Sequence, residues 1–194
     1  MTDRQADHPV DPLFLDRWSP RAFDGSVMPD ADLKTAFEAA RWAPSAFNSQ
    51  PWHFLYARRG DANWDRFLSL LIPFNQSWAH TASVLVYIVS DSLPMTDREG
   101  APKESSTHSF DAGAAWVSLA LQATRMGYRA HGMSGIQYDL ARAELGLAER
   151  YVLNAACVIG RIGDVAQLDE KLQAREHPSD RKPQAEFVHA GGFP

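Results

Sequence analysis

The sequence has one cysteine and no long apolar segment among its 194 residues. The single cysteine, Cys157, excludes an intrachain disulfide framework and a cysteine-rich zinc site. The longest apolar run, Val84–Val89, is far shorter than the roughly 20 residues that a transmembrane helix needs. The residues at the N-terminus lack the apolar stretch of a secretory signal. A cytoplasmic chain with no membrane contact is therefore predicted.

Several catalytic and ligand-binding motifs are also missing. The seven histidines are scattered without an HxxxH or HxH pair, so no spacing indicates a metal site. Ser134 follows a predicted strand, but residues 132–136 lack the last glycine of the hydrolase G-x-S-x-G pattern. Residues 160–163 lack the third, helix-opening glycine of a dinucleotide-binding fingerprint. A metal enzyme, a serine hydrolase and a Rossmann NAD-binding protein are therefore disfavoured.

The chain is acidic overall, but its basic residues are unevenly chosen. The formal net charge is −5, and 15 of the 19 basic residues are arginine. This net charge argues against nucleic-acid binding, although it allows one small internal phosphate site. The arginine excess has two interpretations: genomic base composition, or arginines that bind an anion in bidentate fashion, which lysine does less well. The positions of the arginines have to decide between them.

The length suits one domain, and no repeat, low-complexity tract or change of composition divides residues 1–194. Helical and strand patterns mix without a regular βαβ rhythm, which favours an α+β fold with a sheet flanked by helices. Residues 92–106 are predicted to form a polar surface excursion, and residues 164–194 a polar tail. Helices are expected at residues 30–42 (with Asp30 as N-cap), 61–71, 76–82, 108–126 and 139–145 (with Asp139 as N-cap), and strands at residues 53–57, 83–89, 128–133 and 151–159.

Two of the predicted elements indicate how the core is covered. The strand at residues 83–89 is continuously apolar, which predicts burial on both of its faces. The helix at residues 108–126 is apolar on nearly every side, so it should be buried all round. Because the chain is small, we expect a second subunit to cover part of this helix.

Arg17, Ser19 and Arg21 occupy alternate positions in a segment that Pro20 holds extended. Side chains at alternate positions of an extended segment point to the same side. Two guanidinium groups and a hydroxyl would offer a phosphate charge-assisted and bidentate hydrogen bonds. A pair of solvated arginines near the N-terminus is the other interpretation, and the spacing alone favours neither.

Two further segments combine amide side chains with aromatic residues. Residues 43–52, with the sequence APSAFNSQPW, lie between a predicted helix end and a predicted strand, and two prolines stiffen them. Residues 74–78 place two amides beside aromatic rings. Such segments can present hydrogen-bonding groups to a planar heterocycle, although a well-capped turn also explains the first of them.

In this order, the motifs resemble those of the FMN-dependent nitroreductase family, and the resemblance extends over nearly the whole chain. It implies a nitroreductase-like fold with a central mixed, mostly antiparallel sheet flanked by helices. It also implies an intertwined homodimer with FMN at the subunit interface. The resemblance rests on R-x-S-x-R-x-F at residues 17–23, A-A-R-W-A-P-S at residues 39–45, N-S-Q-P-W at residues 48–52, Asn75, the helix between Gly113 and Gly127, Ser134-Gly135, and R-K-P at residues 181–183.

The resemblance implies that one group of residues holds the phosphate end of FMN. Arg17, Ser19 and Arg21 would bind the phosphate and the ribityl chain, with the backbone of Trp18 alongside. Arg181 would reach the phosphate from the C-terminal tail. These assignments would give the arginine excess a partial functional explanation.

A second group would surround the flavin ring. Asn75 would contact the pyrimidine edge, and the turn Ser134-Gly135 would direct a backbone N–H at N5, the atom that receives and returns the hydride. No side chain is assigned to catalysis, because the cofactor carries the chemistry. The partner subunit would contribute Pro44, Ser45, Asn48 and Gln50.

The chain departs from the family pattern at two positions. Trp78 stands where many relatives carry a basic residue, which predicts weaker charge stabilisation of reduced FMN. Ser179 stands two positions before Arg181, where some relatives carry a second basic residue.

The activity that the resemblance implies is NAD(P)H-dependent reduction of an electron-poor acceptor by a ping-pong mechanism. The acceptor would be a nitroaromatic, a quinone, or a small aldehyde or enone, and NADPH or NADH would be the hydride donor. A flavin-binding or sensing protein without significant turnover is the alternative. The resemblance leaves open the physiological acceptor, the choice of nicotinamide cofactor, and whether residues 92–106 form a lid.

Overall fold

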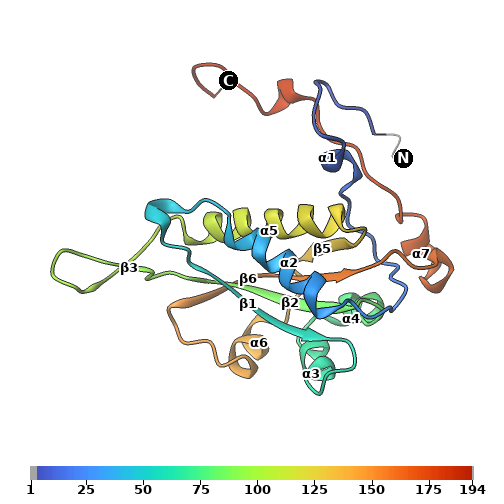
Figure 1. Ribbon diagram of the computed structural model, residues 1–194, viewed down its shortest axis with the longest axis horizontal. Coiled ribbons are helices and arrows are strands. Elements are labelled where there is room, and N and C mark those ends of the chain that lie inside the picture. The colour runs from blue at the N-terminus through green and yellow to red at the C-terminus, as the bar shows by residue number, and fades with distance from the viewer. Residues whose placement is uncertain (1–3, 194) are drawn as a thin grey trace.

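A four-stranded antiparallel sheet with helices on both faces organises the computed structural model, which describes residues 4–193 (Figure 1). The α+β class and the sheet flanked by helices are confirmed. All strand pairs are antiparallel among the described residues, so the parallel part of the predicted mixed sheet is not formed within one chain. Residues 1–3 and Pro194, which belong to the predicted domain, lie outside the described residues. The strand order is β1 (Trp52–Arg58), β2 (Val84–Asp91), β6 (Tyr151–Gly160) and β5 (Arg129–Met133).

Strand β2 contributes to the core on both faces of the sheet. Val84 and Val86 belong to the hydrophobic cluster on one face. Leu85 and Tyr87 belong to the cluster on the opposite face, because successive side chains of a strand alternate. Every residue of β2 is buried, so the predicted burial on both faces is confirmed.

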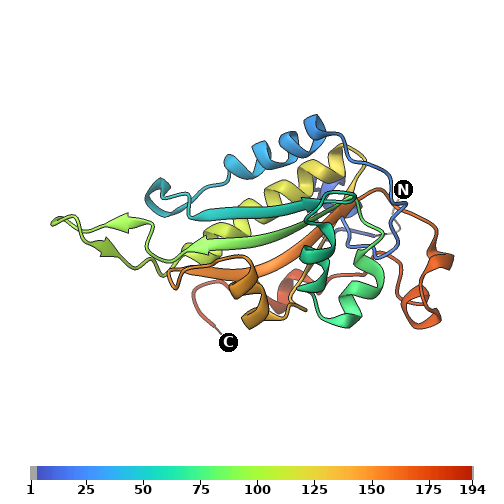
Figure 2. The same ribbon diagram turned by 90° about the horizontal axis from the view of Figure 1, so that it is seen from below.

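Helices α2 (Asp30–Arg41) and α5 (His108–Arg125) form the layer on one face (Figure 2). The prediction that Asp30 is the N-cap of α2 is wrong, because Pro29 occupies that position and Asp30 is already helical. Its carboxylate instead pairs with Lys34 one turn later, at 2.7 Å.

Only one side of α5 is covered within the single chain. Leu119 and Ala120 are fully buried against the sheet, whereas Val117 is 44% exposed and Phe110 points outward. The predicted burial all round is therefore not met by one chain. An apolar strip along α5 remains open.

Helices α3 (Trp64–Ser69), α4 (Pro73–Ala79) and α6 (Tyr138–Glu144) cover the opposite face. Helix α3 is shorter than the helix predicted at residues 61–71. Helix α4 begins at Pro73 and not at the predicted residue 76, because proline is well suited to the first position of a helix. In α6, Gln137 takes the N-cap position, so the prediction that Asp139 caps this helix is wrong.

The surface excursion predicted at residues 92–106 is confirmed, and it forms a small projecting hairpin rather than an irregular loop (Figure 1). Its strands are β3 (Met95–Thr96) and β4 (Pro102–Lys103). The carboxylate of Asp97 accepts hydrogen bonds from two backbone N–H groups of the connecting turn, each at 2.9 Å. These hydrogen bonds hold the tip of the hairpin together.

The N-terminal arm and the C-terminal tail lie side by side on the outer side of α5, above it in the view of Figure 1. The arm contains α1 (Pro12–Asp16), and the tail contains α7 (Glu170–Gln173) with short 3₁₀ turns at Val165–Gln167 and Gln184–Glu186. Both carry exposed apolar side chains, Phe14 and Phe187 among them. Among residues 4–193, no helix has both the length and the apolar character needed to cross a bilayer.

The contact between α5 and the sheet predicts a stability effect. Leu119→Ala removes a fully buried side chain, so we expect the free energy of unfolding to fall by about 2–5 kcal/mol. Urea denaturation at one fixed protein concentration measures this loss. Leu140→Ala on α6, where the side chain is 44% exposed, is the control and should cost under about 0.5 kcal/mol. Equal losses in the two variants would contradict the assigned role of Leu119.

Candidate functional site

A cavity of about 330 Å³ lies where the N-terminal segment, β5 and the tail meet. The structure thereby brings together the residues predicted to hold a phosphate, although they come from opposite ends of the sequence. Five arginines line it, and its described lining contains no carboxylate. The lining residues are Arg4, Arg17, Trp18, Ser19, Arg21, His131, Arg175, His177, Ser179 and Arg181.

The segment from Arg17 to Arg21 forms one wall of this arginine cavity. As the alternate spacing predicted, Arg17, Ser19 and Arg21 all face the same space. Nη1 of Arg17 donates a hydrogen bond to the hydroxyl of Ser19 at 3.3 Å. The carbonyl of Arg17 accepts a hydrogen bond from Arg4 at 2.8 Å, which ties the N-terminal arm to this wall.

The arginines crowd one another electrostatically. Burial lowers the pKa of Arg17, and the positive charges of Arg181 and Arg4 lower it further. Burial likewise lowers the pKa of Arg21, with Arg175 as the next contribution. Both guanidinium groups stay charged, because arginine does not lose its proton under physiological conditions. A bound anion would therefore relieve an unfavourable concentration of positive charge.

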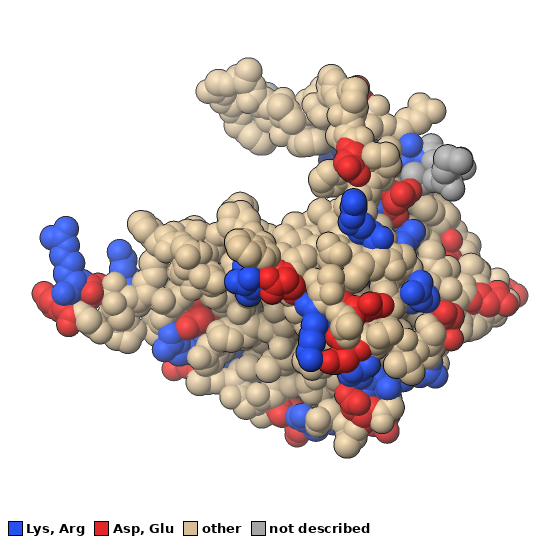
Figure 3. All heavy atoms as spheres, viewed as in Figure 1, with Lys and Arg blue, Asp and Glu red and all other residues tan. Residues whose placement is uncertain are grey.

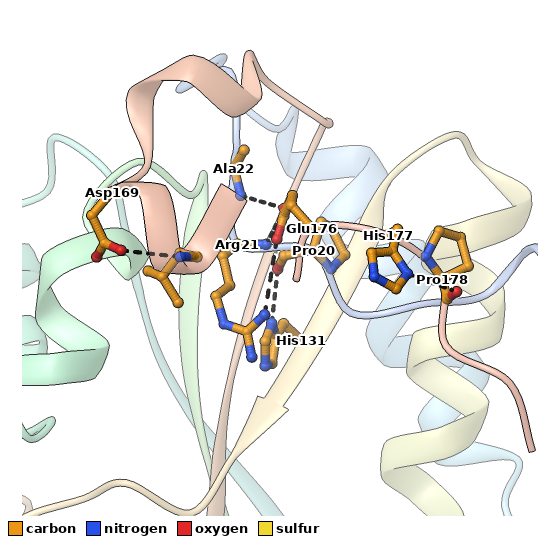
Figure 4. Close-up of polar contacts among 9 residues, drawn as sticks. Pro20, Arg21, Ala22, His131, Asp169, Glu176, His177 and Pro178 are labelled. Carbon is orange, nitrogen blue, oxygen red and sulfur yellow. Dashed lines mark hydrogen bonds and ion pairs between the residues drawn. The ribbon is translucent and has the colours of Figure 1, made fainter. Parts of the chain in front are cut away.

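His131 joins β5 to the arginine-bearing segment. Its Nδ1 lies 2.8 Å from the carbonyl of Pro20 (Figure 4). A carbonyl can only accept, so the proton must sit on Nδ1, and the lone pair is on Nε2. Burial lowers the pKa of His131 to about 4, and the charges of Arg21 and Arg17 act in the same direction. The ring is therefore neutral at pH 7.

The indole of Trp78 supports His131 from the core side. The two ring centroids are 4.6 Å apart, and Trp78 is fully buried at the end of α4. Its Nε1 has no hydrogen-bond partner among the described residues. Trp78, which stands where many relatives carry a basic residue, is therefore a core side chain that packs against the imidazole of His131.

Glu176 is a buried carboxylate of the tail that no sequence motif indicated. It accepts hydrogen bonds from the backbone N–H groups of Arg21 at 2.6 Å and Ala22 at 2.8 Å (Figure 4). Asp169 caps α7 by accepting from the N–H of Leu172 at 3.0 Å, which helps to set the path of the chain toward Glu176 (Figure 4).

The turn Ser134-Gly135 lies beside Asn75, as the two predictions for the flavin ring require. Because α4 begins at Pro73, Asn75 falls in its first turn, where the amide donates to the carbonyl of Gly135 at 3.1 Å. A Cβ at position 135 would clash with this amide, so the contact requires glycine. The structure thus holds an amide side chain against a glycine turn at the end of β5.

The predicted residues Pro44, Ser45, Asn48 and Gln50 do not line the arginine cavity. They precede β1, whose first residue, Trp52, lies opposite Ser90 of β2. His131 of β5 pairs with Val158 of β6, which in turn pairs with Leu85 of β2, so His131 and Leu85 lie at the same height in the sheet. Five residues of strand separate these two levels, which corresponds to about 17 Å. Within one chain, the loop and the cavity are therefore at different ends of the sheet.

This loop holds a strained backbone. Phe47, Asn48 and Gln50 have φ angles of 54°, 55° and 48°, in the left-handed region that non-glycine residues rarely adopt. Gln50 N–H donates to the hydroxyl of Ser45 at 3.0 Å, and the N–H of Ala46 donates to Asp111 at 3.2 Å. Strain of this kind is typical of ligand-binding segments.

Sequence reasoning missed further lining residues. Arg175 and His177 belong to a tail that showed only a polar composition, and Arg4 is the first described residue of the N-terminal arm. No local spacing connects these residues with residues 17–21. At Ser179, where some relatives are basic, the hydroxyl accepts a hydrogen bond from Arg181 at 3.2 Å. Arg4 and Arg175 add positive charge to the same cavity from other positions.

Comparison with known proteins places these features in a family. The family described as "Nitroreductase family" matches residues 15–72 and 68–161. A CLA biosynthesis enone reductase from Lactiplantibacillus plantarum is 25% identical, over 91% of this chain and 93% of that protein. An uncharacterized 15.4 kDa protein from Mycolicibacterium smegmatis is 32% identical, over 66% of this chain and 88% of that protein.

Solved structures of similar proteins have the same fold. An oxidoreductase described as containing FMN is 49% identical and has a TM-score of 0.96, covering 100% of this chain and 98% of that chain. A nitroreductase family protein from Streptococcus pneumoniae, 20% identical, shares the fold with a TM-score of 0.71 over 91% of this chain and 97% of that chain. The family match extends over most of the sequence, from the arginine segment to the end of β6, and the chain therefore belongs to the nitroreductase family.

Proposed function

We propose that the protein is an FMN-dependent NAD(P)H oxidoreductase and that the arginine cavity holds the phosphate of FMN. The convergence of five arginines on one cavity is the observation that carries this proposal. The oxidoreductase that is 49% identical to this chain is described as containing FMN, which supports the choice of cofactor.

The donor set fits a phosphate monoester. Arg17 and Arg21 offer guanidinium groups suited to bidentate contacts with phosphate oxygens, and Ser19 offers a hydroxyl. The Trp18 backbone would lie alongside, and Arg181 would bind from the tail. His131 is neutral, so its Nε2 can accept a hydrogen bond from a hydroxyl of the ribityl chain.

The turn Ser134-Gly135 and Asn75 would orient the flavin ring. When bound, FMN supplies the hydride chemistry, accepting a hydride from a nicotinamide and passing it to the acceptor. The turn would present a backbone N–H toward N5, and Asn75 would contact the pyrimidine edge. The hydrogen bond between Asn75 and Gly135 keeps both groups in one fixed arrangement.

A second copy of the chain would complete the site. Pro44, Ser45, Asn48 and Gln50 lie far from the cavity of their own chain, so we infer that they contact the flavin of the partner in a homodimer. The open apolar strip of α5 supports this inference, as do the exposed apolar side chains of the arm and tail. Figure 3 shows that the outer end of the tail carries no charged side chains on this face.

The acceptor would be an electron-poor compound such as a nitroaromatic, a quinone, or a small aldehyde or enone. The enone reductase similar to this chain supports the last of these classes. Because the family's chemistry depends on the cofactor, the chain needs no dedicated acid or base to perform it.

The first test is reduction of the bound flavin. The purified protein should take up FMN, and anaerobic stopped-flow mixing with NADPH or NADH should bleach its visible flavin band. A protein that takes up no FMN would exclude the proposal. Uptake without reduction by either nucleotide would instead indicate a flavin-binding or sensing protein.

A second test isolates the phosphate contact. Arg21→Ala removes a charged donor, so FMN binding should weaken by about 2–3 kcal/mol, or roughly 30- to 150-fold in Kd. Riboflavin, which has no phosphate, should bind nearly as before. Fluorescence titration measures both affinities, and Arg98→Ala in the exposed hairpin is the control. Unchanged FMN affinity in Arg21→Ala would count against the phosphate assignment.

The third test concerns the neutral state of His131. Since its folded pKa of about 4 lies below the ordinary value of about 6.5, the unfolded chain binds more protons between these values. Stability of the FMN-free protein should therefore fall as the pH is lowered from 6.5 to 4. His131→Asn, which keeps an N–H donor for Pro20, should flatten this part of the profile. A His131 Cε1 proton that titrates near pH 6.5 by NMR would refute the assignment.

A further inference from the structure

Glu176 is a negative charge placed directly behind an array of positive charges. Its side chain is only 1% exposed. Glu176 is not among the residues that line the arginine cavity, whereas its neighbours Arg175 and His177 are. One carboxylate oxygen, Oε1, accepts both backbone N–H groups, from Arg21 and Ala22. The other, Oε2, is buried and has no hydrogen-bond partner among the described residues.

This carboxylate leaves the Arg21 guanidinium available. Nη1 of Arg21 is 3.9 Å from Oε2 of Glu176, which is an ion pair without a hydrogen bond. Nε of Arg21 is buried with no hydrogen-bond partner among the described residues. Glu176 therefore fixes the backbone of Arg21, while the guanidinium keeps donors that an anion can use.

Glu176 is also the last point at which the tail is joined to the sheet-side core by a buried side chain, and beyond it the N–H of Gln184 donates to Asp7 of the N-terminal arm at 3.1 Å. Leu172 of α7 is buried in the core, and from His177 to Phe193 every described residue is exposed or half-buried. The wall that carries Ser179 and Arg181 therefore lies between the Glu176 contact and the contact with the N-terminal arm, and Glu176 is the contact that joins it to the arginine segment. Without that anchor, the like charges of Arg21 and Arg175 would push the two walls apart.

We propose that Glu176 is a positioning residue of the phosphate site, which holds the tail wall (residues 175–181) against the arginine segment (residues 17–22) and thereby couples phosphate binding to docking of the tail. The proposal rests on the proposed function, because it takes the arginine cavity as the phosphate site. A phosphate that contacts both walls stabilises the docked tail, and by reciprocity the docked tail strengthens phosphate binding by the same factor.

Two substitutions at Glu176 separate hydrogen bonding from charge. Glu176→Ala removes the acceptor for both N–H groups. Glu176→Gln keeps an amide oxygen in its place and removes the charge. Because positioning depends on the acceptor, Glu176→Gln should retain FMN binding that Glu176→Ala loses. Glu186→Ala, in the same tail but exposed and paired with Lys182, is the matched control.

The affinities of FMN and riboflavin provide the first readout. Glu176→Ala should raise the Kd for FMN about tenfold or more and the Kd for riboflavin less than about twofold. Glu176→Gln should stay within about threefold of the unsubstituted protein for both ligands. Equal losses for FMN and riboflavin, equal losses in the Ala and Gln variants, or an Ala variant that behaves like Glu186→Ala would each overturn the proposal.

Amide hydrogen exchange with inorganic phosphate as the probe provides a second readout that needs neither FMN nor activity. In the unsubstituted FMN-free protein, phosphate should slow exchange at Arg21, Ala22 and residues 177–182 together. In Glu176→Ala, this joint protection should disappear. Protection of residues 17–22 without the tail, or no protection at all, would refute the coupling. Failure of the unsubstituted protein to bind FMN would instead refute the proposed function.

Discussion

Repulsion between the half-buried guanidinium groups of the arginine segment and the exposed arginines of the tail is the constraint on which the functional end of this molecule depends. Arg17 and Arg21 face Arg175 and Arg181 across one cavity, and burial raises the cost of holding like charges so close. Folding alone would favour separating these side chains. The proposed phosphate of FMN would explain their convergence, and the neutral His131 adds no further charge.

The sheet positions the arginine segment relative to the turn Ser134-Gly135. β5 carries His131, which fixes Pro20 in the arginine segment, and ends at the turn held by Asn75. A single strand therefore links the proposed phosphate end to the proposed ring end. β1 and β2 keep the strained loop before Trp52 about 17 Å from His131 along the strand direction. This separation gives a physical reason for proposing that two chains are needed to surround one flavin.

The sequence patterns predicted those features that depend on residues close together in the chain. The continuously apolar strand at residues 83–89 could only be buried on both faces, and the alternation of Arg17, Ser19 and Arg21 placed them on one side. The caps of α2 and α6 were misassigned because both helices begin earlier than the aspartates indicated, with Pro29 and Gln137 at the N-cap positions. Glu176 left no pattern, since it contacts backbone groups 155 residues away. The apolar composition of α5 predicted burial on every side, but Val117 and Phe110 remain exposed in one chain.

The ionisation of bound phosphate tests the central assignment most directly. A phosphate monoester in water takes up a proton with a pKa of about 6, whereas one surrounded by guanidinium groups should remain a dianion well below that value. The ³¹P NMR resonance of FMN bound to the protein should therefore stay constant between pH 8 and 5. A resonance that moves with a midpoint near 6, as for FMN free in solution, would contradict the placement of the phosphate among Arg17, Arg21 and Arg181.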